Sequence, residues 1–370
     1  MGTRWRPILN RITPYQSGKS LEALAADLGL PDLVRLSSNE SALGPSPRVV
    51  AAIAREASRA HLYPDGGSTA LREALARKLG VAPDQIVVGN GGDELLSIIG
   101  GAALEGGDEV VLPHPSFEPY TTVALLGGAR PVTSPLAGYA TDLGDMGRRI
   151  TARTKIVFVC SPHNPAATIV RRAPLLAFLD SLGAEPPLVV LDEAYRDFCD
   201  DPEYPDGVAL LADRPYLLVL RTFSKIAGLA GLRVGYVVAS AEAVDRLNRV
   251  RTPYNVNRLG QVAALAALED EGHWRTSRQL VLDERAFLSR ELARRGFVFP
   301  PSQANFLLVK VPDAARAQAQ LLRAGLLVRD GTGVGFANHL RIAVGLRETN
   351  ERLLAVLDEI VDPRRCQEPS

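Results

Sequence analysis

Two residues that could perform chemistry lie just beyond apolar runs in the middle of the chain. Asp192 directly follows residues 188–191, and Lys225 comes shortly after residues 216–220. A buried carboxylate must meet a cation or hydrogen-bond donors, whereas a partly desolvated lysine has a lowered amine pKa and can act as a Schiff-base nucleophile. A pyridinium nitrogen would suit Asp192 as the buried donor. The alternative interpretations are a structural ion pair for Asp192 and a solvated strand-end position for Lys225.

A glycine-rich segment could bind a phosphate group. Residues 89–92, Gly-Asn-Gly-Gly, link an apolar run to a predicted helix that begins near Asp93. Free backbone N–H groups and the helix dipole favour an anion at such a helix N-terminus, although an ordinary glycine turn would have the same composition. A dinucleotide fingerprint would need a glycine where Glu94 stands, so a nicotinamide-binding oxidoreductase is a weak alternative.

These segments belong to elements that are typical of an α/β domain. Six apolar runs lack polar alternation, as strands covered on both faces do; they occupy residues 86–88, 109–112, 155–159, 188–191, 216–220 and 235–238. Helical periodicity between them, for example over 93–104 and 173–182, predicts a mostly parallel sheet. Ligands bind beyond the carboxyl ends of such strands. We therefore expect the polar segments 90–93, 114–117, 161–165, 192–195 and 222–225 to converge.

The pattern changes after about residue 256. One long helical region over 262–295 is followed by an apolar run at 305–309, a helix over 313–324, strands near 326–329 and 340–344, and a last helix from Glu348. This order predicts a smaller α+β module. We expect an N-terminal arm and part of the small domain over residues 1–40, a large domain over 41–255 and a small C-terminal domain over 256–370.

The composition argues against several functional classes. The 370-residue chain has 42 Lys and Arg side chains and 42 Asp and Glu side chains. A protein that binds nucleic acid normally has a basic excess, and no apolar stretch is long enough to span a membrane or to form a signal peptide. Three separated cysteines fit neither a disulfide framework nor a zinc site. We expect a cytoplasmic protein with small-molecule partners and no metal.

Three blocks of sequence resemble the aminotransferases of fold type I that use pyridoxal 5′-phosphate. They are Leu-Asp-Glu-Ala-Tyr at 191–195, Arg-Thr-Phe-Ser-Lys at 221–225 and Gly-Leu-Ala-Gly-Leu-Arg-Val-Gly-Tyr at 228–236. The sequence most resembles the histidinol-phosphate aminotransferase family, because further blocks follow that family's order at 36–40, 63–64, 89–94, 253–257, 304–306 and 340–345. The resemblance implies a large domain with a mostly parallel seven-stranded sheet, a smaller α+β C-terminal domain and a homodimer with shared active sites.

The resemblance also implies a role for each matching residue. Lys225 would hold the cofactor and move a proton between the substrate Cα and C4′, Asp192 would keep the pyridine nitrogen protonated, and Tyr195 would complete this catalytic set at the ring oxygen. The implied cofactor-binding residues are Tyr63 (from the second subunit), Gly92, Asp93, Phe117, Asn164, Asp192, Tyr195, Thr222, Ser224, Lys225 and Arg233. The implied substrate-binding residues are Tyr15, Asn39, Arg329 and Arg341. Arg341 would pair with a carboxylate, and Arg329 and Tyr15 would meet a distal phosphate.

Departures from the family pattern leave the substrate open. The usual Thr-Gly pair before the aspartate strand is Ala166-Ala167, and Pro115-Ser116-Phe117 replaces the commoner Pro-Thr-Tyr, which removes a hydroxyl beside the ring. We predict transfer of an amino group between an amine or amino acid and a 2-oxo acid such as 2-oxoglutarate, with histidinol phosphate and glutamate as the family's usual pair. The alternatives are an aromatic amino acid aminotransferase and a cyclase or decarboxylase of secondary metabolism that uses the same cofactor.

Overall fold

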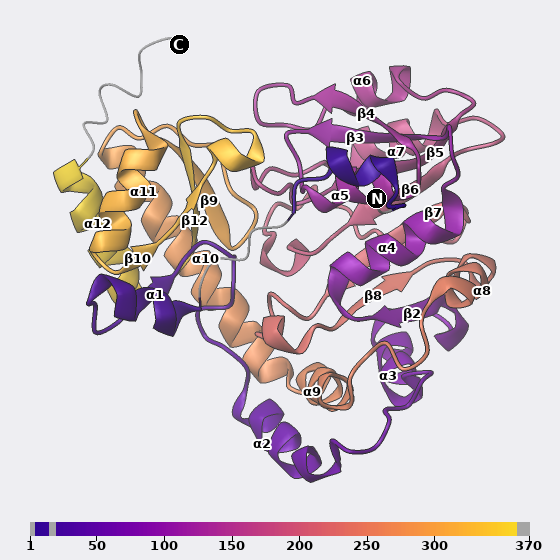
Figure 1. The fold of residues 1–370 in the computed structure, drawn as a ribbon, viewed down its shortest axis with the longest axis horizontal. Coiled ribbons are helices and arrows are strands. Elements are labelled where there is room, and N and C mark those ends of the chain that lie inside the picture. The colour runs from indigo at the N-terminus through magenta and orange to yellow at the C-terminus, as the bar shows by residue number, and fades with distance from the viewer. Residues whose placement is uncertain (1–3, 15–19, 361–370) are drawn as a thin grey trace.

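The computed structural model describes residues 4–14 and 20–360, which form a large α/β part and a smaller part beside it (Figure 1). The strands of the large part are β2 (Ile86–Gly89), β3 (Glu109–His114), β4 (Arg130–Pro135), β5 (Thr154–Cys160), β6 (Leu188–Asp192), β7 (Leu217–Thr222) and β8 (Gly235–Val238). Its helices are α2 (Pro47–Glu56), α3 (Thr69–Leu79), α4 (Gly91–Ala103), α5 (Pro119–Leu126), α6 (Leu143–Arg148), α7 (Arg172–Asp180), α8 (Ala241–Val250) and α9 (Arg258–Leu268).

The smaller part combines an N-terminal segment with the end of the chain. Its elements are α1 (Leu21–Leu28), β1 (Val34–Arg35), α10 (Glu271–Arg294), β9 (Phe306–Lys310), α11 (Ala314–Arg323), β10 (Leu326–Leu327), β11 (Arg329–Asp330), β12 (His339–Ala343) and α12 (Arg347–Ile360). β11, β12 and β9 form an antiparallel sheet, and β1 pairs in parallel with β10. The single strand predicted near residues 326–329 is therefore two short strands that belong to different sheets.

The large sheet has the strand order β2-β8-β7-β6-β5-β3-β4. β8 runs antiparallel to both β2 and β7, and the other neighbouring pairs are parallel. The predicted α/β fold with a mostly parallel seven-stranded sheet is confirmed. Because the parallel strands point the same way, the loops that follow them meet at one edge of the sheet.

The six apolar runs all form strands of this sheet, whereas the sequence did not predict β4. β4 pairs only with β3, at the end of the sheet. Its sequence, Arg-Pro-Val-Thr-Ser-Pro, is mostly exposed or half-buried. An edge strand tolerates proline and polar side chains because one of its sides has no ladder partner. A search for buried apolar runs therefore overlooks it.

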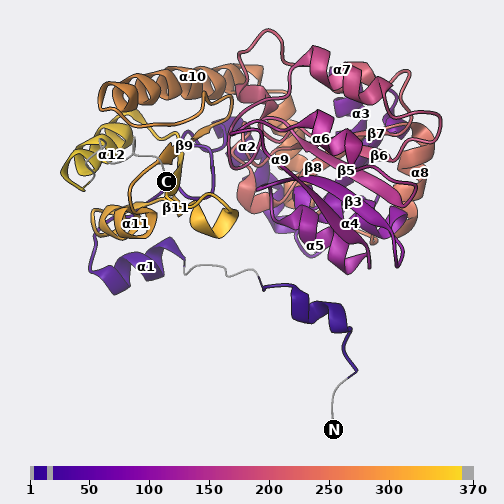
Figure 2. The ribbon, with the colours of Figure 1, turned by 90° about the horizontal axis from the view of Figure 1, so that it is seen from above.

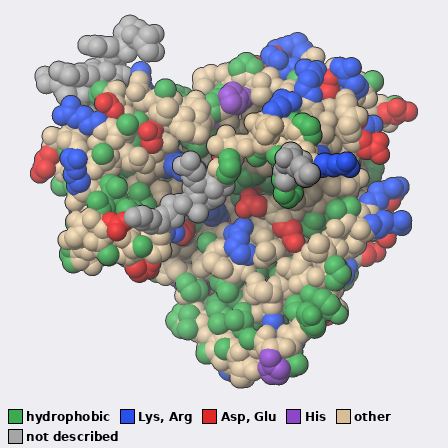
Figure 3. All heavy atoms as spheres, in the orientation of Figure 1, with side chains coloured by type: hydrophobic (Ala, Val, Ile, Leu, Met, Phe, Trp, Pro, Cys, Tyr) green, Lys and Arg blue, Asp and Glu red, His purple; other side chains and the backbone are tan. Residues whose placement is uncertain are grey.

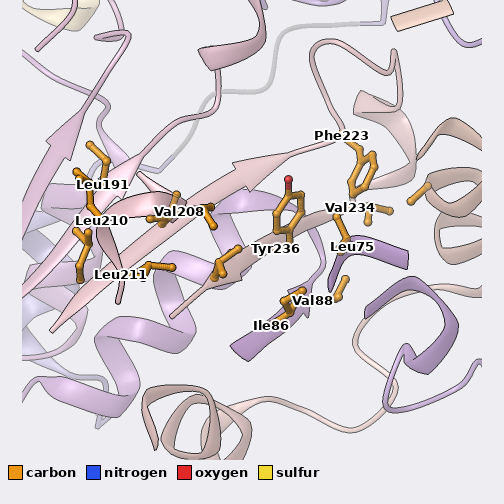
Figure 4. Packing of buried hydrophobic residues seen from close by; sticks show 14 of the residues in the cluster. Leu75, Ile86, Val88, Leu191, Val208, Leu210, Leu211, Phe223, Val234 and Tyr236 are labelled. Atoms are coloured by element: carbon orange, nitrogen blue, oxygen red, sulfur yellow. The ribbon is translucent and has the colours of Figure 1, made fainter. Parts of the chain in front are cut away.

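Successive side chains along the strands enter two different cores. In β5, Val157 and Val159 belong to a cluster with residues of α2, α3, α6, α7 and α9, while Ile156 and Phe158 belong to a cluster with residues of α4, α5 and α8. Figure 2 shows α7 on one side of the strands and α4 and α5 on the other. Figure 4 shows part of the first cluster, with Tyr236 of β8 in its middle. Burial of both faces explains why these strands are continuously apolar.

The helical region predicted over residues 262–295 consists of two helices, because the chain breaks at Asp270. This side chain caps α10 by accepting a hydrogen bond from the N–H of His273 at 3.1 Å, as N-cap carboxylates do. α9 packs on α2 and α3 in the large part, whereas Leu288 and Leu292 of α10 pack in the core of the smaller part. The division between residues 255 and 256 stays a prediction, and this packing favours a boundary within α10.

Candidate active site

The edge at which the parallel strands end brings the predicted polar segments together. Asp192 is the last residue of β6 and Thr222 the last residue of β7, and β2 leads directly into α4. β8 begins at the same edge because it runs the other way, and its first residue, Gly235, pairs with both Gly89 and Thr222. Arg233, two residues before β8 begins, therefore reaches the N-terminus of α4.

Lys225 lies in the loop after β7. Its Nζ donates a hydrogen bond to the backbone oxygen of Ser38 at 3.2 Å and lies 5.6 Å from the ring centroid of Tyr195. Burial, together with the nearby charge of Arg341, lowers the pKa of Lys225 to about 8, because both disfavour the protonated amine. The amine is thus readily deprotonated near physiological pH, as a nucleophile must be.

Asp192 is buried, with 4% of its surface exposed. Its Oδ2 accepts a hydrogen bond from the hydroxyl of Tyr120 at 2.6 Å, and its Oδ1 accepts one from the backbone N–H of Ala194 at 3.0 Å. Burial raises the pKa of Asp192 to about 6. The described partners of this carboxylate are hydrogen-bond donors rather than a cation, so the structure does not support a structural ion pair at Asp192.

Shared neighbours place Lys225 and Asp192 around one site. The charge of Asp93 raises the pKa of both residues. The ring of Tyr195 lies under the amine of Lys225, and the charge of Asp192 helps to raise the pKa of Tyr195. Burial raises the pKa of Tyr195 to about 12, so its hydroxyl keeps a proton to donate, and it accepts a hydrogen bond from Nδ2 of the buried Asn39 at 3.1 Å.

Arg341 on β12 connects the smaller part to this site. Its Nη1 donates to Oδ1 of Asn164 at 2.8 Å, and its Nη2 donates to the backbone oxygen of Ser37 at 2.5 Å. Asn164 lies in the loop after β5, so the first of these bonds joins the two parts. Arg329 on β11 is the direct cross-strand neighbour of Arg341. Like charges in such positions repel each other, and an anion between them would relieve the repulsion.

The N-terminus of α4 is shaped by glycine. The side chain of the preceding residue, Asn90, does not cap the helix. The first backbone N–H groups of the helix therefore face the edge of the site without a capping side chain. Gly91 has a φ of +82°, and a Cβ at this position would lie 2.5 Å from Nη2 of Arg233. The left-handed backbone favours glycine here, and the absence of a side chain lets the guanidinium approach closely.

Hydroxyl and guanidinium groups surround this helix end. The hydroxyls of Thr222 and Ser224 lie 3.0 Å apart, and Arg233 donates from Nη2 to Oδ2 of Asp93 at 3.2 Å. Together with the backbone of Gly92, they form a set of donors suited to a phosphate group. An ordinary glycine turn would not require this set.

Two further predicted residues, Phe117 and Tyr63, make aromatic contacts. Phe117 is half-buried in the loop after β3, and its ring meets the ring of Tyr120 edge-on at 5.6 Å. Tyr63 is 77% exposed and stacks on Tyr254 with ring centroids 4.7 Å apart. Tyr15 lies outside the described residues.

The departures at residues 166–167 lie in a tight turn beside Asn164. The backbone N–H of Ala166 donates to Nδ1 of His163 at 3.3 Å, and the N–H of Ala167 donates to the His163 backbone oxygen at 2.6 Å. Ala167 has a φ of +62°, so the backbone keeps a left-handed shape that favours glycine although the glycine is lost. Burial lowers the pKa of His163 to about 4, which keeps its imidazole neutral.

Sequence reasoning missed two aromatic residues of the site. Tyr120 lies in the first turn of α5 and donates a hydrogen bond to Asp192. Phe306 begins β9, meets the ring of Tyr195 edge-on at 5.1 Å and lies 5.6 Å below the guanidinium of Arg341. Neither residue belongs to a recognisable spacing, although Phe306 falls within the 304–306 block, and only the packing of distant elements reveals their contacts.

A buried ion pair supports the two central strand ends. Nη2 of Arg221 lies 2.7 Å from Oε2 of Glu193, and both side chains are almost completely buried. Glu193 directly follows Asp192, and Arg221 directly precedes Thr222. Glu193 also pairs with Arg196, and Arg221 also pairs with Asp206, so removal of either central partner would weaken a buried charge network. A sequence signal for this pair existed, because Glu193 and Arg221 are charged residues next to the predicted site residues Asp192 and Thr222.

The residues present fit pyridoxal phosphate. The donors at the start of α4 suit its phosphate, the amine of Lys225 suits its aldehyde, and the buried Asp192 carboxylate suits a protonated ring nitrogen. Within the described parts of the chain, no group of three or more His, Cys, Asp or Glu side chains could hold a metal ion. Among the described helices, none has the length and apolar character needed to cross a membrane.

Comparison with known proteins decides the family. The family model of aminotransferase class I and II matches residues 31–357. The chain belongs to this family. Histidinol-phosphate aminotransferases of Moorella thermoacetica and an Anaeromyxobacter species are each 43% identical to this aminotransferase, covering 96% of it and 92% and 98% of their own lengths. It is a pyridoxal-phosphate-dependent transaminase, as the resemblance of its blocks implied.

A solved structure agrees with this assignment. The histidinol-phosphate aminotransferase of Sinorhizobium meliloti, in complex with pyridoxal 5′-phosphate, is 29% identical to this aminotransferase with a TM-score of 0.88, and the match covers 97% of this chain and 98% of the other. The fold type I prediction is therefore confirmed along nearly the whole chain. The comparisons do not favour the aromatic aminotransferase, cyclase or decarboxylase alternatives.

Proposed function

We propose that this aminotransferase transfers the amino group of histidinol phosphate to a 2-oxo acid, with 2-oxoglutarate and glutamate as the second pair. The observation that carries the proposal is the cross-strand pair of Arg329 and Arg341, in which the charge of Arg341 acts on the amine of Lys225. Histidinol phosphate and glutamate each carry an anionic group distant from the reacting nitrogen. The curated relatives named above carry the same activity in their names.

Three residues perform the proton chemistry in this proposal. Bound pyridoxal phosphate supplies an aldehyde for the substrate nitrogen and an electron sink for the charge left at the substrate Cα. The neutral amine of Lys225 would take the proton from the substrate Cα and deliver it to C4′ of the cofactor. The carboxylate of Asp192 keeps a proton on the ring nitrogen, and Tyr195 donates its hydroxyl hydrogen to the ring oxygen.

The remaining residues bind and orient. Gly92 and Asp93, with Thr222, Ser224 and Arg233, hold the cofactor phosphate. Phe117 covers one face of the ring, and Asn164 assists Tyr195 at the ring oxygen. The hydrogen bonds from Asn39 to Tyr195 and from Arg341 to Asn164 support these orientations.

Two arginines divide the substrate anions between them. Arg341 binds the carboxylate of glutamate through its planar fork, and Arg329, with Tyr15, binds the distal phosphate of histidinol phosphate. Since β11 and β12 are adjacent, one site can accept both partners of the reaction in turn.

A substrate panel tests the proposal. We expect histidinol phosphate to be converted far more efficiently than phenylalanine, with glutamate formed from 2-oxoglutarate. Arg329→Gln should lower kcat/KM for histidinol phosphate by about tenfold or more, as loss of a charge-assisted hydrogen bond would, and should change kcat/KM for unphosphorylated histidinol much less. Equal losses for both amines would contradict the phosphate role of Arg329, and release of carbon dioxide from an amino acid without a keto product would favour a decarboxylase.

We further propose that the working unit is a homodimer with shared active sites. Apolar side chains gather on the surface of the lower lobe in Figure 3, where Figure 1 draws α2. Val50, Leu62, Tyr63 and Tyr254 are exposed apolar residues, and contiguous exposed apolar surface is typical of protein interfaces. Tyr63 would reach the cofactor phosphate of the second subunit. A cytoplasmic location stays a prediction.

A further inference from the structure

The fully buried Tyr120 contacts the proposed ring-nitrogen partner, although no sequence block of the resemblance includes it. It lies in the first turn of α5 and donates its hydroxyl to Oδ2 of Asp192 at 2.6 Å. We propose that Tyr120 is a positioning residue that keeps the Asp192 carboxylate ionised and directed at the ring nitrogen of pyridoxal phosphate. This inference rests on the role proposed above for Asp192.

The bonding of the carboxylate supports this role. Tyr120 occupies one lone pair of Oδ2, and the N–H of Ala194 occupies one lone pair of Oδ1. Each oxygen of an ionised carboxylate can accept a further hydrogen bond, so both remain able to accept one from a ring N–H. The two existing bonds restrict how the carboxylate can turn.

The electrostatics of the site favours a hydrogen-bond donor next to the Asp192 carboxylate. Burial raises the pKa of Asp192 to about 6 even though the hydrogen bonds from Tyr120 and Ala194 lower it, because a donor stabilises the charged form of the carboxyl. Burial and the charge of Asp192 raise the pKa of Tyr120 well above its ordinary value, so the hydroxyl keeps its proton and donates. Without this donor, Asp192 would be protonated more easily and would hold the ring proton less well.

Aromatic packing holds the hydroxyl in its direction. The ring of Tyr120 stacks on Phe158 of β5, with centroids 4.4 Å apart and an interplanar angle of 9°, and meets Phe117 edge-on at 5.6 Å. Such contacts persist in phenylalanine. Tyr120→Phe therefore removes the hydroxyl and keeps the packing, which makes it a selective test.

The test compares two cofactors on the full-length protein. The dissociation constant is measured for pyridoxal phosphate and for its deaza analogue, in which a C–H group replaces the ring nitrogen. We expect Tyr120→Phe to weaken binding of pyridoxal phosphate by about tenfold, as loss of a hydrogen bond to a charged group does, and to leave binding of the analogue within about twofold. Tyr216→Phe, which removes a hydroxyl bonded to the Leu179 backbone oxygen, is the matched control and should change neither constant.

Asp192→Asn separates this inference from the function on which it rests. If Asp192→Asn weakens pyridoxal phosphate selectively and Tyr120→Phe weakens both cofactors equally or neither, the role of Tyr120 is wrong and that of Asp192 stands. If Asp192→Asn is not selective, both proposals fall. The double variant should bind pyridoxal phosphate as Asp192→Asn does, and a further loss would show that Tyr120 acts independently of Asp192.

Discussion

Lys225 shows at the residue scale how burial prepares a side chain for chemistry. Its amine is the same group as in any exposed lysine, and the difference comes from its surroundings. Desolvation and the charge of Arg341 lower its pKa to about 8. At pH 7 about a tenth of the amine is neutral, against well under a thousandth for a lysine with an unperturbed pKa. Only the neutral amine can attack an aldehyde.

This pKa predicts how cofactor loading depends on pH. The rate at which cofactor-free enzyme combines with pyridoxal phosphate should rise with pH and level off above about pH 8, because the pKa is lowered and the neutral amine predominates above it. Stopped-flow absorbance measures this rate. Arg341→Gln removes the charge that lowers the pKa of Lys225 most and should move the midpoint to higher pH, and Lys225→Ala should form no covalent adduct. A midpoint unchanged by Arg341→Gln would contradict this account.

The turn after β5 illustrates the element scale. It carries Asn164 against Arg341, and its shape depends on a left-handed φ of +62° at Ala167. An L-residue with a side chain pays about 1–2 kcal/mol in this conformation. The hydrogen bonds that His163 makes to residues 166 and 167 hold the turn in place. The element thus keeps the backbone of a glycine turn without its glycine.

Ala167→Gly should therefore be tolerated better than the same change at a neighbouring residue. Both changes remove a buried methyl and make the unfolded chain more flexible, but only Ala167→Gly relieves left-handed strain, so we expect its free energy of unfolding to be about 1–2 kcal/mol higher than that of Ala166→Gly. Urea denaturation with saturating cofactor measures the change. Ala166→Gly is the matched control, because Ala166 is equally buried but has an ordinary φ, and it should lower stability. Equal losses of stability at the two positions would contradict the strain.

The proposed homodimer is a property of the whole molecule. Tyr63 is exposed and stacks on Tyr254 at the surface of its own chain, so its proposed contact with a cofactor needs a second chain. Mixing inactive Lys225→Ala chains with Tyr63→Ala chains should restore activity, because one site of each mixed dimer then has both residues. Activity equal to the average of the two separate variants would show that the sites are not shared.

Charge placed in the apolar surface gives the corresponding test of assembly. Val50 on α2 is 52% exposed and Val298 in the smaller part is 39% exposed. Val50→Asp should shift the sedimentation of the protein from dimer towards monomer, because a dimer would bury the new carboxylate. Val298→Asp should leave the dimer unchanged. If both variants stay dimeric, the contact lies elsewhere on the surface.

Much of the fold and the centre of the site could be predicted because each depends on a short segment. A strand buried on both faces is continuously apolar wherever its neighbours lie, so β5 and β6 were visible in the sequence. Lys225 and Asp192 were found because each follows such a run. The edge strand β4 was missed because exposure permits polar residues, and the break between α9 and α10 was missed because one aspartate cap interrupts an otherwise continuous periodicity.

The sequence by itself determined the fold class and the residues that end the central strands, since these follow from local composition, and the resemblance of its sequence blocks to a known family indicated the cofactor. Only the tertiary structure decided which distant residues meet. The bond between Tyr120 and Asp192 joins α5 to β6, and the pairing of Arg329 with Arg341 depends on the register of β11 and β12. Hydrogen bonds and charge pairs act over a few ångströms, so their partners are set by how the elements pack and not by their order along the chain.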